Sequence, residues 1–238
     1  MDPYAQVAEL YELEYGRLEA DVAFYARNGT GGPLLVGGCG TGRVARRLAT
    51  DRKVTGVDRS AAMLAVARRL APELRWVQAD LRDFDEHGFS EVILPNAAFS
   101  FLATRADQQR CLERCHAALK EGGLLTIDVP MPAFHLWSIR DGPERLAWAG
   151  ALPDGRPVRR TRQTRRFLAE QRLELTDRFY IDDRLVHTSA LRLRVFLPSE
   201  AEWMLEASGF AVDEILGDYS GGRLQDGSPR ILVRALRL

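Results

Sequence analysis

The sequence is poor in cysteine, balanced in charge and free of long apolar runs. Its three cysteines have no companion CxxC or histidine pair, so no metal site is expected, and such thiols are typical of a reducing cytoplasm. The 33 basic and 33 acidic residues cancel, which argues against nucleic acid or an anionic membrane as a partner. No apolar stretch approaches the length of a membrane span. We therefore expect a cytoplasmic protein with no nucleic-acid partner, no membrane partner and no bound metal.

What the sequence does contain is a regular alternation of short apolar runs and helical patterns. Its 238 residues, 46% of them apolar, suffice for one α/β domain with an insertion. Apolar spacing predicts one or two helices within 4–26, and further helices at 43–49, 61–70 (with Ser60 as N-cap) and 107–119. Buried strands are expected at 34–36, 54–57, 74–78, 91–94 and 124–129. This alternation predicts an α/β fold with a doubly wound, mostly parallel sheet.

The pattern changes after the fifth expected strand. Between 158 and 196 apolar and polar residues alternate, and Asp182-Asp183 separates two such runs as a hairpin turn does. An inserted antiparallel sheet of about three strands is therefore expected. A helix at 200–208 capped by Ser199, with strands at 211–216 and 230–238, completes the parallel sheet to seven strands. The expected organisation is N-terminal helices and core at 1–131, an antiparallel lid at 132–196 and a C-terminal completion of the core at 197–238.

The stretch LLVGGCGTGR, residues 34–43, joins the first expected strand to a helix through a glycine-rich loop. Unpaired N–H groups and the positive end of the helix dipole meet there, and positions without side chains let a ligand approach the backbone. The loop fits both the GxGxxA of dinucleotide binders, at 40–45, and the GxGxG of S-adenosylmethionine binders, at 38–42.

Two acids distinguish between these fingerprints. Asp58 ends the second expected strand, where a carboxylate can accept hydrogen bonds from ribose hydroxyls in either class. Asp80 ends the third expected strand, where it can accept from an adenine amino group. A dinucleotide gives this second acid no comparable role, so the pair favours S-adenosylmethionine.

Four successive motifs, GGCGTGRVA, VTGVDRSAAML, WVQADLRDF and LKEGGLLTIDV, resemble those of the class I S-adenosylmethionine-dependent methyltransferases. The C-terminal FLPSEAEWMLEASGFAVDEILGDYSGG is similar to the closing segment of members that act on small molecules. The resemblance covers nearly the whole chain. It implies a Rossmann-like methyltransferase fold, enzymatic methyl transfer and S-adenosyl-L-methionine as the cofactor.

The resemblance also implies which residues contact the cofactor. They belong to the glycine loop, to the ends of the second and third strands with the helix between them, and to the segment beneath the reactive methyl. The resemblance assigns the methionine end to Gly38, Cys39, Gly40 and Gly42, and the ribose and adenosine to Asp58, Arg59 and Met63. It assigns the adenine to Asp80 and Leu81, and the floor beneath the methyl group to Pro95 and Asn96.

Val36 departs from the family's first motif, which usually carries an acid at this position. That acid helps to set the loop and the cofactor's ammonium group, whereas an apolar side chain accepts no hydrogen bond. Three outcomes are open: another acceptor substitutes, the cofactor binds more weakly, or the chain is a non-catalytic S-adenosylmethionine-binding module. Because the later motifs are intact, we favour the first. A nicotinamide-dependent oxidoreductase, which rests on residues 40–45 alone, is a further alternative.

The methyl acceptor is expected to be a small molecule. The sequence lacks the Asn-Pro-Pro-aromatic and Pro-Cys motifs of nucleic-acid methylation, and the expected lid resembles that of enzymes that methylate glycine-like amines or amino sugars. A neutral amine needs no strong base, whereas a hydroxyl usually does, so nitrogen is slightly favoured over oxygen. His135 and Tyr15 are the candidate catalytic residues, and Tyr11 is expected to close over the site with Tyr15. The chain is expected to be a monomer or a homodimer.

Overall fold

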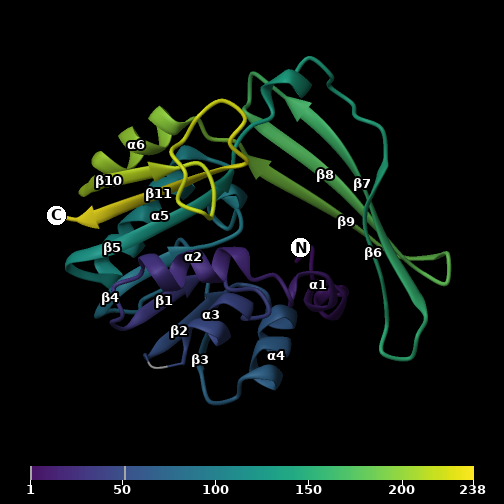
Figure 1. Cartoon of the computed structure of the whole chain (residues 1–238), viewed down its shortest axis with the longest axis horizontal. Helices are drawn as coiled ribbons and strands as arrows, with labels where there is room; N and C mark the ends of the chain where they lie inside the picture. Colours follow the sequence, from purple (N-terminus) through teal and green to yellow (C-terminus); the bar gives the residue numbers. More distant parts are fainter. Residues whose placement is uncertain (1, 51) are drawn as a thin grey trace.

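The computed structural model describes residues 2–50 and 52–238, which form two separate β-sheets flanked by helices (Figure 1). The larger sheet has seven strands in the order β10-β11-β5-β4-β1-β2-β3. In chain order these strands are β1 (Leu34–Gly37), β2 (Val54–Asp58), β3 (Arg75–Gln78), β4 (Phe89–Leu94), β5 (Leu119–Pro130), β10 (Phe210–Leu216) and β11 (Arg230–Arg237).

The strand directions match those predicted from the alternation of strands and helices. Strands β3, β2, β1, β4 and β5 pair in parallel, whereas β11 runs antiparallel to both β5 and β10. The chain reverses its winding direction between β1 and β4, and doubly wound sheets bind ligands outside the carboxyl ends of their strands at such a switch point. The predicted mostly parallel seven-stranded sheet is confirmed.

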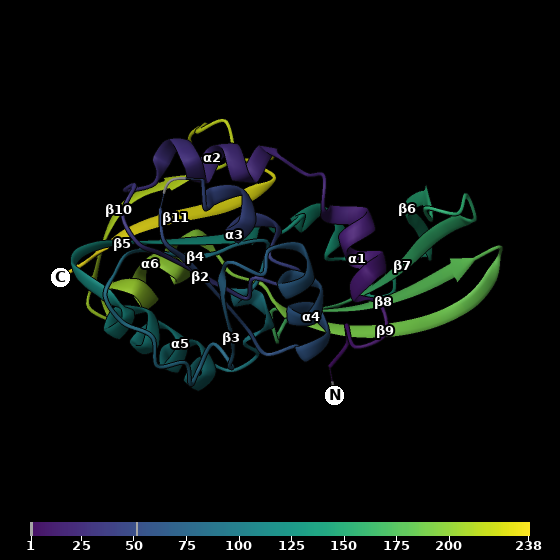
Figure 2. The same ribbon diagram turned by 90° about the horizontal axis from the view of Figure 1, so that it is seen from below.

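Helices cover both faces of this sheet, so that α2 and α5 lie on opposite sides of the strands (Figure 2). The alternating side chains of β1 show how both faces are filled: Leu35 packs into the cluster with α5 and α6, while Leu34 and Val36 pack into the cluster with α2 and α3. The helices are α1 (Ala8–Tyr15), α2 (Ala20–Asn28), α3 (Arg43–Leu48), α4 (Ala61–Leu70), α5 (Arg105–Ala118) and α6 (Pro198–Glu206), with short 3₁₀ turns at Phe99–Phe101 and Phe134–Leu136.

The smaller sheet lies between β5 and α6 in the chain and is antiparallel throughout. Asp182 and Asp183 form the predicted turn, with φ angles of 50° and 59°. The sequence predicted about three strands, and the structure has four. The additional strand, β6, is almost entirely exposed, so it lacks the apolar alternation by which a half-buried strand is recognised. The strands are β6 (Arg145–Ala151), β7 (Pro157–Phe167), β8 (Arg172–Ile181) and β9 (Arg184–Arg194).

Helix α1 connects the two sheets, and Figures 1 and 2 both place it between the core and the strands β6–β9. One side of the α1 segment, with Val7 and Leu10, packs against Val158 and Phe179 of the smaller sheet. Its other side packs Ala8 into a cluster with two side chains of α4. Burying an apolar side chain of this size contributes about 1.5–3 kcal/mol. Contacts on both sides therefore hold α1 in place, and with it the start of the chain.

The predicted start of α6 is wrong. The helix begins at Pro198, not after Ser199, and its N-cap is Leu197. Proline suits the first helical position because its missing N–H would have no partner there. Leu197 has no side-chain acceptor for the first turn, but its own backbone N–H donates to a carboxylate oxygen of Glu200 at 3.4 Å, which is the reciprocal half of a capping box. By contrast, the predicted Ser60 cap of α4 is confirmed, since its hydroxyl accepts from the Met63 N–H.

Candidate active site

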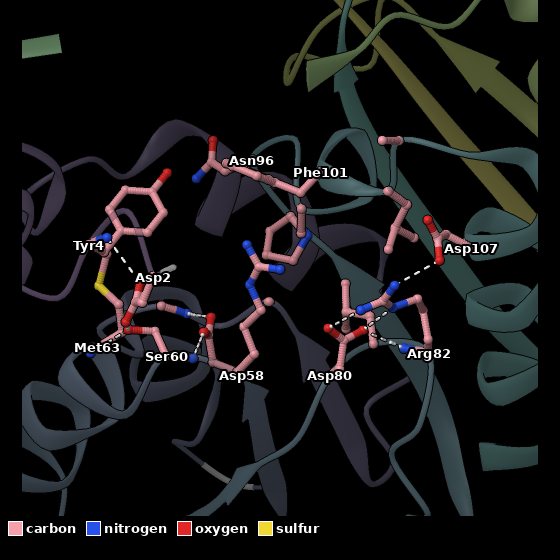
Figure 3. A pocket seen from close by; sticks show the side chains of 18 of the residues that line it. Asp2, Tyr4, Asp58, Ser60, Met63, Asp80, Arg82, Asn96, Phe101 and Asp107 are labelled. Carbon is pink, nitrogen blue, oxygen red and sulfur yellow. Dashed lines mark hydrogen bonds and ion pairs between the residues drawn. The ribbon is translucent and has the colours of Figure 1, made fainter. Parts of the chain in front are cut away.

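A cavity of about 330 Å³ opens at the carboxyl ends of β1 to β4. Figure 3 shows Asp58, Ser60 and Met63 toward one end and Asp80, Arg82 and Asp107 toward the other, with Asn96 and Phe101 along the opposite wall. Nine of the eleven residues that the sequence assigned to a cofactor line this one cavity: Gly38, Gly40, Asp58, Arg59, Met63, Asp80, Leu81, Pro95 and Asn96.

Two glycines of the loop expose backbone to the cavity. Gly38 and Gly40 have φ angles of 66° and 56°, a left-handed conformation that residues with side chains rarely adopt. A Cβ atom at Gly38 would also lie 2.6 Å from Cβ of Ala98, so the segment after β4 packs directly against the loop. Gly38 is therefore required both by the turn and by the close approach of these two segments, and Gly40 by the turn alone.

Asp58 connects the glycine loop to α4. Its two carboxylate oxygens accept hydrogen bonds from the backbone N–H groups of Gly40 and Ser60, each at 2.8 Å. Burial raises the pKa of Asp58, while the two N–H donors and the nearby Arg59 oppose that rise. A carboxylate held in this way still has lone pairs for further donors, such as ribose hydroxyls.

Arg82 holds the opposite end of the cavity together. Its guanidinium donates to both carboxylate oxygens of Asp80, at 2.7 and 2.9 Å, and to Asp107 in the first turn of α5 at 2.7 Å. These hydrogen bonds lower the pKa of Asp80. The carboxylate at the predicted adenine position is therefore ionised and fixed in direction, and α5 is tied to the end of β3.

Two residues assigned to the cofactor do not line the cavity. Cys39 is buried, and burial raises the pKa of its thiol. Gly42 has a φ angle of 81°, and a Cβ there would lie 2.4 Å from Cη2 of Trp76. The third glycine of the motif is thus needed for helix–strand packing, since the Trp76 ring occupies the space that a side chain there would need.

The candidate catalytic residues also lie outside the cavity. His135 is exposed in the 3₁₀ turn after β5. Tyr15 stacks on Tyr11 with ring centroids 4.5 Å apart, and Arg160 donates to its hydroxyl at 3.2 Å. Tyr11 does line the cavity, so the contact of Tyr15 with the site is indirect and runs through the Tyr11 ring on which it stacks.

The sequence did not single out several residues that the fold brings to the cavity. Tyr4 is the most informative, because it packs on Phe101 and on the apolar face of β8 and β9. Among the described residues no member of the four-stranded sheet lines the cavity. This sheet packs against the N-terminal segment, and residues of that segment line the cavity. The sequence assigned none of these positions to the cofactor; they are Asp2, Tyr4, Ser60, Arg82, Ala98, Phe101, Leu102, Ala103 and Asp107.

The cavity has the features that S-adenosylmethionine needs. Side-chain-free backbone at Gly38 and Gly40 admits the methionine end, and Asp58 offers acceptors for a ribose. The fixed carboxylate of Asp80 stands beside the apolar side chain of Leu81, as an adenine site requires. Over the two described ranges, no cluster of His, Cys, Asp and Glu side chains is placed to hold a metal ion. None of the helices in those ranges has the length and apolarity to cross a membrane.

Comparisons with known proteins agree with this reading of the cavity. Residues 35–123 match the family model of a methyltransferase domain. The chain is similar to dTDP-3-amino-3,6-dideoxy-alpha-D-glucopyranose N,N-dimethyltransferase of Streptomyces fradiae. The two sequences are 29% identical over 243 residues, and the alignment covers 96% of this chain and 92% of the relative.

Solved structures show the same fold along the whole chain. The CcbJ methyltransferase of Streptomyces caelestis superposes with a TM-score of 0.85 at 21% identity, over 99% of this chain and 98% of the other. An amino pentose methyltransferase of Micromonospora echinaspora, solved with S-adenosylmethionine bound, has a TM-score of 0.75 at 26% identity, over 100% and 99% of the two chains.

Residues 35–123 thus form a methyltransferase domain, and the chain is a methyltransferase that uses S-adenosyl-L-methionine as its cofactor. The predicted family, fold and cofactor are confirmed. These similarities give no support to a nicotinamide-dependent oxidoreductase or to a non-catalytic binding module.

Proposed function

We propose that this enzyme methylates the amine nitrogen of a small molecule, namely an amino sugar. The observation that carries the proposal is the similarity to a sugar N,N-dimethyltransferase along 96% of this chain. The amino pentose methyltransferase, similar over the full length, supports the same acceptor class. The name of the first relative states that it methylates nitrogen, and the name of the second states that its substrate is an amino pentose.

The chemistry of the cavity supports nitrogen over oxygen. No histidine is found among its described lining residues. Burial raises the pKa values of Tyr4 and Tyr11, so both phenols stay protonated and make poor bases at neutral pH. A hydroxyl acceptor usually needs a base to become nucleophilic, whereas an amine in its neutral form attacks without one. An amine therefore suits this site.

Methyl transfer demands positioning more than proton chemistry. The cofactor supplies an electrophilic methyl group on a sulfonium, and the reaction is an in-line displacement by the acceptor nitrogen. In our proposal the backbone of Gly38 and Gly40 holds the methionine end, while Asp58 and Asp80 hold the ribose and the adenine. The stacked Tyr11 and Tyr15, joined to the smaller sheet through Arg160, form the wall toward the acceptor and exclude water.

The acceptor class can be tested with matched sugars. Purified enzyme and S-adenosylmethionine are incubated with a nucleotide-linked 3-amino-3,6-dideoxyhexose, and separately with the same sugar carrying a hydroxyl in place of the amine. Mass spectrometry then detects the added methyl groups, and a coupled assay measures S-adenosylhomocysteine. We expect one or two methyl groups on the amino sugar and none on its hydroxyl counterpart. Methylation of the hydroxyl sugar, or of neither sugar, would refute the proposal.

A further inference from the structure

Asn96 is held in an unusual backbone conformation at the wall of the cavity. It follows β4, and both it and Ala97 have positive φ angles, 49° and 65°. Two hydrogen bonds to Asp128 maintain this conformation: the Asn96 N–H donates to Oδ2 at 3.1 Å, and the Ala97 N–H donates to the backbone carbonyl at 2.9 Å. Backbone strain of this kind persists where the surroundings impose it, and it concentrates at functional sites.

A buried ion pair lies behind Asn96. Arg43, at the start of α3, donates to both carboxylate oxygens of Asp21 in α2, at 2.7 and 2.5 Å. Their side chains are only 6% and 5% exposed. Charges so deeply buried are tolerated only with closely matched partners, so the pair has a fixed geometry. The same Asp21 carboxylate lies 3.2 Å from Nδ2 of Asn96.

This contact determines which way the Asn96 amide faces. An ionised carboxylate only accepts hydrogen bonds, so the NH₂ end of the amide must point to Asp21. The carbonyl oxygen, Oδ1, is then turned away from Asp21 and has no donor among the residues that the structure describes. Asn96 lines the cavity and its Nδ2 is engaged by Asp21, so Oδ1 is the end of the amide that is left for a ligand.

The position of this acceptor matches what the glycine loop lacks. Val36 is fully buried in the apolar cluster with Phe24 and Tyr25, so it supplies no acceptor to the cofactor. The segment that carries Asn96 packs against Gly38, because a Cβ atom at Gly38 would lie 2.6 Å from Cβ of Ala98. Asn96 therefore lies beside the part of the loop that receives the methionine end of the cofactor, which carries an ammonium group.

We propose that Oδ1 of Asn96 accepts a hydrogen bond from the ammonium group of S-adenosylmethionine, and that the Asp21–Arg43 pair positions it. Asn96 thereby does the work for which related enzymes use an acid at position 36. The inference rests on the cofactor and is independent of the acceptor, so its failure would leave the amino-sugar proposal untouched. A hydrogen bond to a charged group contributes about 1.5–3 kcal/mol, which corresponds to about a tenfold to hundredfold change in affinity.

The test is calorimetric titration with S-adenosylhomocysteine and with its desamino analogue, which lacks only the ammonium group. Asn96→Gly removes the acceptor and tolerates the positive φ angle, so the backbone is not strained. We expect this variant to bind S-adenosylhomocysteine about tenfold to a hundredfold more weakly and the desamino analogue as the wild type does. Equal weakening for both ligands, or weakening for neither, would overturn the assignment.

A second variant tests the positioning role. Asp21→Asn offers a single carbonyl oxygen to both Arg43 and Asn96, so we expect the preference for S-adenosylhomocysteine over its desamino analogue to fall, with folding verified by circular dichroism. An unchanged preference would refute the positioning role. If Asp21→Asn abolishes that preference while Asn96→Gly leaves it intact, Asp21 itself is the acceptor and the proposal fails. Asn28→Ala is the matched control, because it removes an amide from the same helix that bonds only to the Phe24 carbonyl.

Discussion

Gly42 offers a direct test of why the loop needs its third glycine. Its φ angle is 81°, and a Cβ atom there would lie 2.4 Å from Cη2 of the Trp76 ring. Gly42→Ala therefore meets two penalties. The left-handed backbone costs a residue with a side chain about 1–2 kcal/mol, and an extra carbon forced into a packed region costs about 1–3 kcal/mol. The expected loss in the free energy of unfolding is about 2–5 kcal/mol.

Gly88 provides the matched control. Its φ angle is 85°, and a Cβ atom there would have nothing within 4 Å. Gly88→Ala should therefore lose only the backbone contribution of about 1–2 kcal/mol. The effect of alanine on the unfolded chain is the same in both variants and cancels in the comparison. For a chain of this size each kcal/mol moves Tm by about 2–4 °C, so the two variants separate clearly.

Urea denaturation monitored by circular dichroism measures both losses, and a double-mutant cycle identifies the cause. Replacing Trp76 by leucine removes the ring that Gly42→Ala would clash with, so the alanine should be less damaging in that background. We expect a coupling of about 0.5–3 kcal/mol between the two positions. Equal losses at Gly42 and Gly88, or a cycle with no coupling, would refute packing against Trp76 as the reason for this glycine.

Three further outcomes follow from the same contacts. Asp58→Asn leaves one of two backbone N–H donors without its acceptor and removes the charge, so calorimetry should show S-adenosylhomocysteine binding about tenfold to a hundredfold more weakly; undiminished binding would exclude a ribose role. Burial raises the pKa of Asp58, and ribose hydroxyls donate best to the ionised form, so wild-type affinity should fall on acidification and begin to fall at a higher pH than an ordinary aspartate would cause; a flat profile would contradict this. Arg82→Met loses two ion pairs, to Asp80 and to Asp107, in which the arginine is 35% exposed, so urea denaturation should show a loss of no more than about 2 kcal/mol. A larger loss would mean that the link between Asp80 and Asp107 supports the fold as well as the cavity.

The core fold, and the gathering of most of the predicted cofactor residues at one cavity, could be predicted from the sequence because their signals are local. A buried parallel strand and an amphipathic helix each leave a pattern within about ten residues. Asp58 is the last residue of one such strand and Asp80 lies two residues beyond another, and the carboxyl ends of parallel strands meet at one edge of the sheet. Knowing the strands was therefore enough to bring both acids and the glycine loop to one cavity.

The remaining features depend on contacts between residues far apart in the chain, and only the tertiary structure decided them. Gly42 looks like a cofactor contact until Trp76 is seen packed on it. Tyr4 has no motif, and it reaches the cavity because the smaller sheet supports it from behind. The amide of Asn96 gains its direction from Asp21, which lies 75 residues away in sequence. Local patterns determine which elements form, whereas the packing between those elements determines which side chains face the ligand.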